Sequence, residues 1–323
     1  MPIADVNHRI ACALIAAVFG NSGAPARAAD PTTELAAGGL VYAGQQIFIT
    51  RQEDIVISVE RIRVTYTIEN VAPAPRTALM AFALPDLDMP ALDGSQVENP
   101  AYDPLNPTNF VGFTALVGGQ PAETYVESRA LSLGLVDATR TLLDLALPLY
   151  PLHPDIAERL SALPDAAKED LLARSLIRAI DGQLEPQWTL KTTLFWQQPF
   201  AAGQSQIITI SYRPIVGSST WSPETSALLQ QRFCVPPTAA AELTRRAAGP
   251  APVTVKWVQF QASAGASVRG AAATYRVSLE AKSPKQPAYT CRNGLNAPTA
   301  SGTREHIQSD ALPEDEIQVL FVD

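Results

Sequence analysis

The chain has 323 residues, of which 46% are hydrophobic and 17% charged, and its formal net charge is −8. This composition supplies enough apolar side chains for a folded core, and the length suggests about two domains. An acidic chain without a long basic run is poorly suited to nucleic acid, because that binding depends on neutralising phosphates. We therefore expect a folded protein that does not bind nucleic acid.

Residues 1–28 are predicted to be a secretory signal peptide. The apolar run 10–19 follows a short, weakly positive segment and is too short to span a membrane. Ala26-Arg27-Ala28 offers the small residues that signal peptidase accepts, so cleavage is predicted after Ala28. We expect a periplasmic or secreted protein that keeps no transmembrane helix after cleavage; a buried N-terminal helix is the alternative.

Two cysteines remain after the predicted cleavage, Cys234 and Cys291. An even number of cysteines in an exported chain favours a disulfide, because the compartment is oxidising. A pair of buried free thiols is the alternative. The chain contains no C-x-x-C spacing, which disfavours redox catalysis and a thiolate zinc site.

Between residues 39 and 84 apolar and polar residues alternate, which indicates β-strands with one face in water. The pattern is clearest where Ile62, Val64 and Tyr66 are separated by arginine and threonine. We predict strands over 47–50, 54–58, 61–70 and 77–84.

The segment 85–109 is predicted to be a long loop, because it holds five prolines and little apolar periodicity. Its carboxylates Asp86, Asp88 and Asp93 are weak candidates for Ca²⁺ ligands, since Ca²⁺ prefers several hard oxygens in flexible geometry. A solvated loop whose carboxylates cap turns is the alternative. Glu98 and Asp103 are candidates for contact with a binding partner.

After this loop we predict a hairpin and then helices. Strands over 110–117 and 123–128 flank the turn at Gly118-Gly119. The helices are expected over 137–147 with Asp137 as N-cap, 155–163, and 165–180.

Strands then resume and continue to the end of the chain, with 188–197 and 206–213 as the next hairpin. A short helix is predicted over 223–231, and the alanine-rich piece 239–251 is expected to be a mobile connector. The remaining strands are predicted over 253–261, 273–280, 288–292, 304–309 and 316–322.

These elements predict a mainly β fold of the α+β class, with antiparallel, sandwich-like sheets and a helical insertion between two β-rich halves. The expected division is 29–134 for the N-terminal half, 135–184 for the insertion and 185–323 for the C-terminal half.

Several short motifs lie in order along the chain: 34–40 (ELAAGGL), 62–66 (IRVTY), 83–86 (ALPD), 126–131 (VESRAL), 188–193 (WTLKTT), 212–217 (YRPIVG) and 319–321 (VLF). With these motifs the mature chain resembles, over nearly all its length, a bacterial exported family known as domain of unknown function 4424. The resemblance implies an exported bacterial protein without an established activity.

Motifs for catalysis or cofactor binding are absent from the sequence. It contains no nucleophile elbow, no P-loop and no dinucleotide-binding fingerprint, and its two mature histidines, His153 and His306, are far apart. Among the four tryptophans, Trp188 and Trp196 are expected in the sheet core, whereas Trp221 follows a loop and is expected to be the most exposed. Trp221 is therefore the candidate for a sugar-stacking or partner-binding contact.

These observations favour a non-enzymatic scaffold that binds an envelope protein or glycan through the acidic loop or the helical insertion, without a cofactor. The alternatives are a hydrolase of envelope polysaccharide that uses paired carboxylates, and a Ca²⁺-stabilised binding module.

Overall fold

The computed structural model describes residues 39–42, 47–90, 96–98, 102–103, 105–261, 274–283, 286–292, 295, 304–309 and 316–323. The chain divides into Met1–Asp30 and Pro31–Asp323, and every element below belongs to the second unit. The predicted signal peptide and Asp93 lie outside the described residues.

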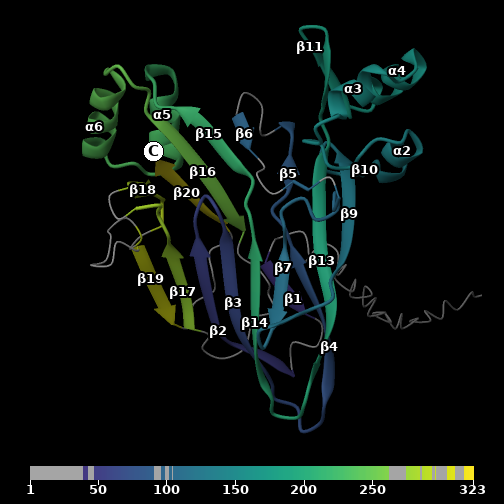
Figure 1. Ribbon diagram of the computed structural model, residues 1–323, viewed down its shortest axis with the longest axis vertical. Helices are drawn as coiled ribbons and strands as arrows, with labels where there is room; N and C mark the ends of the chain where they lie inside the picture. Colours follow the sequence, from purple (N-terminus) through teal and green to yellow (C-terminus); the bar gives the residue numbers. More distant parts are fainter. Residues whose placement is uncertain are drawn as a thin grey trace, which may run out of the picture. The chain divides into compact units, whose positions relative to one another are not determined.

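Sheet A is antiparallel and contains strands from before and after the helical insertion (Figure 1). Its strand order is β1 (Gly39–Tyr42), β4 (Arg76–Ala83), β13 (Thr189–Phe200), β9 (Tyr125–Ser132) and β10 (Val136–Asp137), and β5 (Leu87–Asp88) also pairs with β13.

Sheet B is antiparallel except that β17 runs parallel to β2. Its order is β19 (Arg304–Ser309), β17 (Thr274–Leu279), β2 (Phe48–Ile57), β3 (Ile62–Asn70), β14 (Ser205–Tyr212), β7 (Thr114–Val117) and β8 (Gln120–Pro121). The predicted turn at Gly118-Gly119 is confirmed, but the strand that pairs with β7 across it is β8, whereas β9 lies in sheet A.

A core shared by sheets A and B forms from residues that alternate along their strands. On β3, Val64, Tyr66 and Ile68 are buried as the sequence pattern predicts, and they belong to one cluster with Phe82 and Trp196 of sheet A. Burying an aliphatic side chain of this size contributes about 2 kcal/mol, so this core supplies most of the stability of the two sheets.

The connection between β13 and β14 differs from the predicted hairpin, because the two strands lie in different sheets. The buried Asn70 at the end of β3 holds this connection: its side-chain amide donates to the carbonyl oxygens of Ala201, at 2.9 Å, and Ala74, at 3.1 Å. Its backbone N–H donates to the carbonyl of Gln204 at 2.9 Å. The turn is thereby attached to β3 and directs the chain from one sheet to the other.

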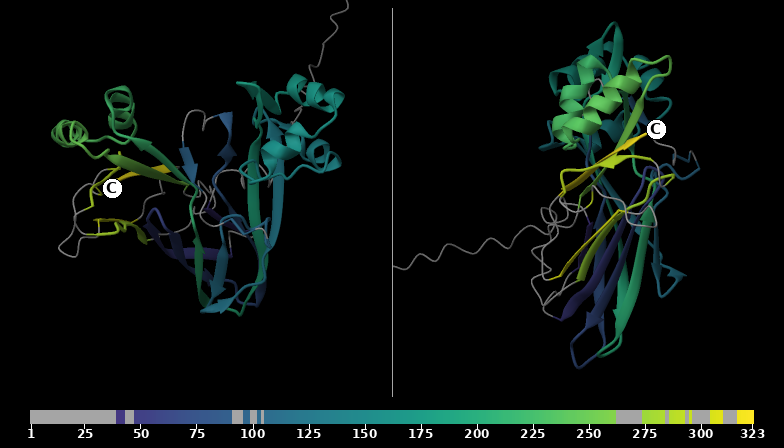
Figure 2. Two further views of the ribbon diagram at one scale, coloured as in Figure 1. Left: turned by 45° about the horizontal axis from the view of Figure 1, so that its top comes forward. Right: turned by 90° about the vertical axis from the view of Figure 1, so that its left-hand side faces the viewer.

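Sheet C is antiparallel, and apart from β6 its strands all follow β14 in the chain (Figure 2). Its order is β18 (Ala288–Tyr289), β20 (Glu316–Val322), β16 (Thr254–Gln261), β15 (Val216–Thr220) and β6 (Gln96–Glu98). One face joins the main core through Val258 and Phe260. The other face is covered by α5 (Pro223–Arg232) and α6 (Pro237–Ala247), whose Leu229 and Leu243 pack in a second cluster with Val255.

The helix α6 occupies most of the segment that we expected to be a mobile connector, so that prediction is wrong. Alanine is the strongest helix former, and Pro237 stands at the first turn, where a proline is well accommodated. The buried Leu243 then anchors the helix on sheet C.

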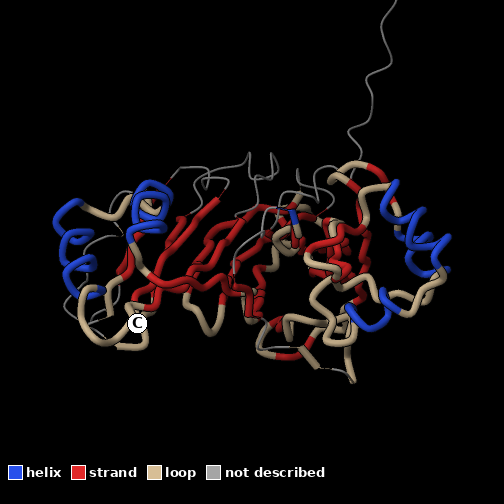
Figure 3. The backbone as a smooth tube through the Cα atoms, turned by 90° about the horizontal axis from the view of Figure 1, so that it is seen from above, coloured by secondary structure: helices blue, strands red, loops and turns tan. Residues whose placement is uncertain are grey.

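The helical insertion packs on sheet A through its own core, which includes Trp188 and Ala130. Its elements are α2 (Thr139–Asp144), α3 (Ile156–Ser161), α4 (Asp165–Ala173), β11 (Ile177–Ile180) and β12 (Gln183–Pro186). Figure 3 shows this group of helices and the α5–α6 pair on opposite sides of the sheets.

Two of the predicted helix boundaries in the insertion need correction. The helix predicted over 165–180 ends at Ala173, because Ser175 adopts a left-handed backbone with φ of 54° and the following residues form β11. Asp137 belongs to β10, and the residue at the N-cap of α2 is Ala138. The Asp137 carboxylate nevertheless accepts the backbone N–H of Thr139 at 2.9 Å, so it still stabilises the start of the helix.

The predicted disulfide between Cys234 and Cys291 is confirmed. It joins the connection between α5 and α6 to the segment after β18, with a separation of 57 residues. Closing a loop of this length stabilises a fold by on the order of 4 kcal/mol in the chain-entropy model.

Candidate functional site

The short strand β6, from the acidic segment, separates two cavities. Val97 pairs with Gly217 of β15, and Gly217 in turn pairs with Trp257 of β16. Because successive side chains of a strand point to opposite faces, Val97 and Glu98 line different sides of this three-stranded wall. Val97 lines the first cavity, and Glu98 lines the second.

The first cavity, which we term the acidic-segment cavity, has a volume of about 320 Å³. Most of its lining residues are apolar or aromatic, among them Leu87, Val97, Phe110, Ile215 and Trp257, and polar atoms provide about half of its surface. Its volume falls within the range of small-molecule sites, about 300–1,000 Å³.

The Trp257 indole forms one side of this cavity because residue 217 is glycine. A Cβ atom at Gly217 would overlap the indole ring of its cross-strand neighbour. The Arg232 guanidinium lies over the same indole, with Cζ 5.9 Å from the ring centroid, and its Nε donates to Gln318 at 2.8 Å. Glycine at position 217 thus permits the Trp257 indole to lie against β15. The contacts with the Trp257 ring and with Gln318 hold Arg232 at the cavity.

Asp86 and Asp88, two of the predicted Ca²⁺ ligands, both line the acidic-segment cavity. The Lys191 ammonium donates to Asp86 at 2.6 Å, and the Thr189 hydroxyl donates to Asp88 at 3.1 Å. Burial raises the pKa of Asp86, and the bond from Lys191 opposes that effect. Among the residues that the structure describes, no group of three or more His, Cys, Asp or Glu side chains could hold a metal ion, so calcium binding stays a prediction.

Tyr212 lines the same cavity and is only 3% exposed. Its hydroxyl has no hydrogen-bond partner within the described part of the chain. Burial raises the pKa of Tyr212 far above its ordinary value, so the phenol stays protonated and keeps a proton to donate. A buried hydroxyl without a partner costs stability, which a ligand that accepts its hydrogen bond would recover.

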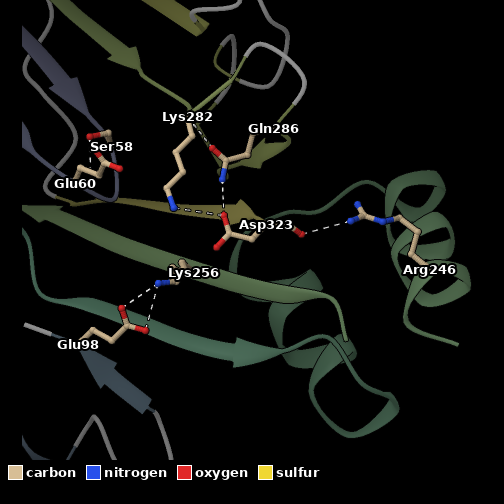
Figure 4. A network of polar contacts seen from close by, with 8 residues as sticks. All are labelled: Ser58, Glu60, Glu98, Arg246, Lys256, Lys282, Gln286 and Asp323. Atoms are coloured by element: carbon tan, nitrogen blue, oxygen red, sulfur yellow. Dashed lines mark hydrogen bonds and ion pairs between the residues drawn. The ribbon is translucent and has the colours of Figure 1, made fainter. Parts of the chain in front are cut away.

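The second cavity is a polar cleft of about 920 Å³ on the other side of the wall. Its lining includes Arg61, Lys256 and Lys282, together with Glu60 and Glu98. Lys256 donates to both carboxylate oxygens of Glu98, at 3.0 and 3.3 Å (Figure 4). Glu98, predicted to contact a partner, therefore has an intramolecular partner that ties β6 to β16.

A network of polar contacts continues along this cleft (Figure 4). Lys282 lies 3.9 Å from the Asp323 carboxylate, and the Gln286 amide donates to the same carboxylate at 2.9 Å. On the facing turn, the Ser58 hydroxyl accepts the backbone N–H of Glu60 at 3.3 Å. The charged side chains of this network thus bond to one another or to nearby polar groups of the same chain.

The other candidate residues lie apart from these cavities. Trp221 is 1% exposed, so the expectation of an exposed platform is wrong. Its indole N–H donates to Thr244 at 3.1 Å, which buries it between sheet C and α6. Asp103 is exposed and accepts the backbone N–H of Leu105 at 2.9 Å. His153 accepts the backbone N–H of Asp155 at 3.1 Å.

Sequence reasoning alone did not single out Tyr212, Arg232 and Trp257 as one site. They come from β14 of sheet B, helix α5 and β16 of sheet C, and only the packing of these elements brings them to Asp86. The sequence held one indication of this site: the ALPD and YRPIVG motifs both contribute residues to the wall of the acidic-segment cavity.

These sheets and cavities define a β-rich α+β protein with a cavity of small-molecule size at the acidic segment. The model of a family described as Domain of unknown function (DUF4424) matches residues 28–320, and the chain belongs to that family. No curated protein matches the sequence.

A solved structure with some similarity is that of a "putative nutrient binding protein" from Legionella pneumophila. It shares 13% sequence identity, and the match covers 88% of this chain and 70% of that one, with a TM-score of 0.40. A likeness at this level carries no argument about the present protein. Within the described residues, none of the helices has the length and hydrophobicity needed to cross a bilayer.

Proposed function

We propose that this chain is an exported, non-enzymatic binding protein that holds a small zwitterionic molecule with an apolar or aromatic body in the acidic-segment cavity. The predicted signal peptide, with cleavage after Ala28, supports a periplasmic or secreted location. The Cys234–Cys291 disulfide fits the oxidising conditions found there.

One observation carries the choice of ligand: the cavity combines apolar walls with two opposite charges that lack ion-pair partners. Asp88 accepts a hydrogen bond from a neutral hydroxyl, and Arg232 donates to a neutral amide. Neither forms an ion pair with any residue that the structure describes. A ligand with an ammonium and a carboxylate group would complement both, and its apolar body would contact Trp257 and Phe110.

The hydrolase alternative is less well supported, although Asp86 and Asp88 share one cavity. Glycoside hydrolysis needs one carboxyl that keeps a proton to donate and a second that is ionised. Burial raises the pKa of Asp86, but the Lys191 ammonium donates to this carboxyl at 2.6 Å and opposes the rise. A general acid is better served by a carboxyl without a lysine bound to it, so this salt bridge weighs against the hydrolase.

Point substitutions suit the test better than deletion of the acidic segment. Removing residues 88–104 would also remove β6 and Tyr102, whose ring stacks on Tyr150 at 5.5 Å between centroids. Loss of binding by such a deletion would not separate a lost site from a lost wall of sheet C. The variants Asp88→Asn and Arg232→Gln each remove one charge from the cavity, and Asp103→Asn in the same segment is the matched control.

Binding is tested with thermal unfolding and calorimetry of the mature protein, using phenylalanine, leucine and tryptophan as probes. We expect stabilisation by the free amino acids, since a ligand at 100 times its Kd adds about 2.7 kcal/mol. N-acetyl derivatives, which lack the ammonium, and amides, which lack the carboxylate, should bind at least tenfold more weakly.

Each variant should also lose the ability to distinguish free phenylalanine from one of its two derivatives. Asp88→Asn should no longer distinguish phenylalanine from its N-acetyl form, and Arg232→Gln should no longer distinguish it from the amide. Absence of binding by all zwitterionic probes, or equal affinities for Asp88→Asn, Asp103→Asn and the wild type, would contradict the proposal.

A further inference from the structure

A second groove, of about 660 Å³, lies where the β7–β8 hairpin meets sheet A. It does not share a lining residue with the acidic-segment cavity. Leu79 of β4, Tyr125 of β9 and Phe195 of β13 contribute its apolar surface. These residues alternate with buried ones along their strands and so lie on the face of sheet A that points away from the main core.

This face of sheet A exposes large apolar side chains. Tyr125 is 55% exposed and Leu79 is 49% exposed. Tyr125 and Phe195 are cross-strand partners whose rings stack, with centroids 5.7 Å apart and an interplanar angle of 28°. Large apolar side chains gathered on a surface mark an interaction site more often than single ones do.

The polar lining of the groove consists of amides and one carboxylate, and it contains no lysine or arginine. Gln120 and Gln197 are exposed, and their side-chain amides make no hydrogen bond to any residue in the described part of the chain. Glu123 accepts a long hydrogen bond, 3.5 Å, from the Tyr125 hydroxyl. Each glutamine offers both a donor and an acceptor, which suits a ligand with many hydroxyl groups.

We propose that this groove binds an uncharged oligosaccharide. The apolar C–H faces of a sugar ring would pack on the Tyr125 and Phe195 rings, and its hydroxyls would exchange hydrogen bonds with Gln120 and Gln197. A polyanion is disfavoured because the lining has no cation. The site is independent of the ligand proposed for the acidic-segment cavity, so either proposal can fail alone.

The test is calorimetry and affinity electrophoresis of the mature protein with maltohexaose, cellohexaose and chitohexaose as probes. We expect binding of at least one probe, unchanged between low and high NaCl, because no ionic contact is involved. Tyr125→Ala should weaken binding at least tenfold, and Tyr125→Phe, which keeps the ring, should preserve it. Leu135→Ala, at an 84% exposed position in the turn between β9 and β10, is the control and should bind like the wild type.

Substitution of Tyr125 is preferred to that of Phe195 because its side chain is more than half exposed, so its loss should leave the fold intact. Circular dichroism and the thermal midpoint of each variant confirm this point. The proposal is overturned if the wild type binds none of the three probes at millimolar concentration. It is equally overturned if Tyr125→Ala binds as well as the wild type, or if binding disappears in high salt.

Discussion

Replacing Glu53 with glutamine is expected to stabilise the protein above pH 7. Glu53 lies on β2, is 3% exposed, and stands between Tyr66 and Tyr275 on the neighbouring strands. Burial raises the pKa of its carboxyl to about 7, with a smaller opposing effect from the Tyr66 hydrogen bond and a further rise from Asp54. The folded protein therefore binds this proton more tightly than the unfolded chain does.

The sign and size of the effect follow from that difference. Stability that depends on the protonated carboxyl is fully present below the ordinary pKa of about 4.5, and it is lost as the pH rises through about 7. One pKa unit corresponds to about 1.4 kcal/mol, so the ionised carboxyl costs about 3 kcal/mol at pH 8. Glutamine resembles the protonated carboxyl in shape and cannot ionise, so Glu53→Gln should avoid this cost.

The measurement is urea unfolding of the wild type and Glu53→Gln at pH 5 and pH 8. Between these values the wild type should lose about 2–3 kcal/mol more than the variant does. Glu69→Gln, at a partly exposed position of the same sheet, is the control and should follow the wild type. If Glu53→Gln and the wild type showed the same dependence on pH, the buried carboxyl would not be the group responsible and the reasoning would be refuted.

Three further predictions concern the C-terminal sheet and its helices. Replacing Cys234 and Cys291 with alanine should lower the free energy of unfolding by up to about 4 kcal/mol, measured against the oxidised wild type in urea. Gly217→Ala should destabilise the protein by about 1–3 kcal/mol, because the new Cβ overlaps the Trp257 indole; an unchanged midpoint would contradict this packing. Glu98→Gln should change stability by less than about 1 kcal/mol, since the Glu98 side chain is about half exposed to water in its ion pair with Lys256.

Local sequence patterns predicted many of the strands because the burial that stabilises a strand is visible in its period of two. On β3 the alternation seen in the sequence matches the buried face of the strand. The helices of the insertion were also predicted, but the end of α4 was not. The left-handed turn there is at Ser175, and the sequence has no glycine at this position to indicate that the helix ends. Helix α6 was missed although Ala240, Leu243 and Ala247 stand at helical spacing, because the alanine-rich composition resembles that of a connector.

The position of Trp221 shows where local reasoning fails. Its neighbours in sequence resemble a loop, and a tryptophan in a loop is a natural candidate for a binding platform. The helices α5 and α6 that follow fold back over sheet C and bury it, which no pattern around residue 221 indicates. The exposed aromatic pair, Tyr125 and Phe195, instead lies on strands whose pairing joins residues 70 positions apart.

By itself, the sequence determined the family and the β-rich class, and it favoured a disulfide between Cys234 and Cys291, because motifs, strand periodicity and cysteine number are properties of the chain alone. Only the tertiary structure decided that β13 and β14 lie in different sheets and that β6 forms part of sheet C. It also decided that Asp88 and Arg232 share one cavity. The physical reason is that a site is made by contacts between distant segments, and those contacts depend on how whole sheets pack.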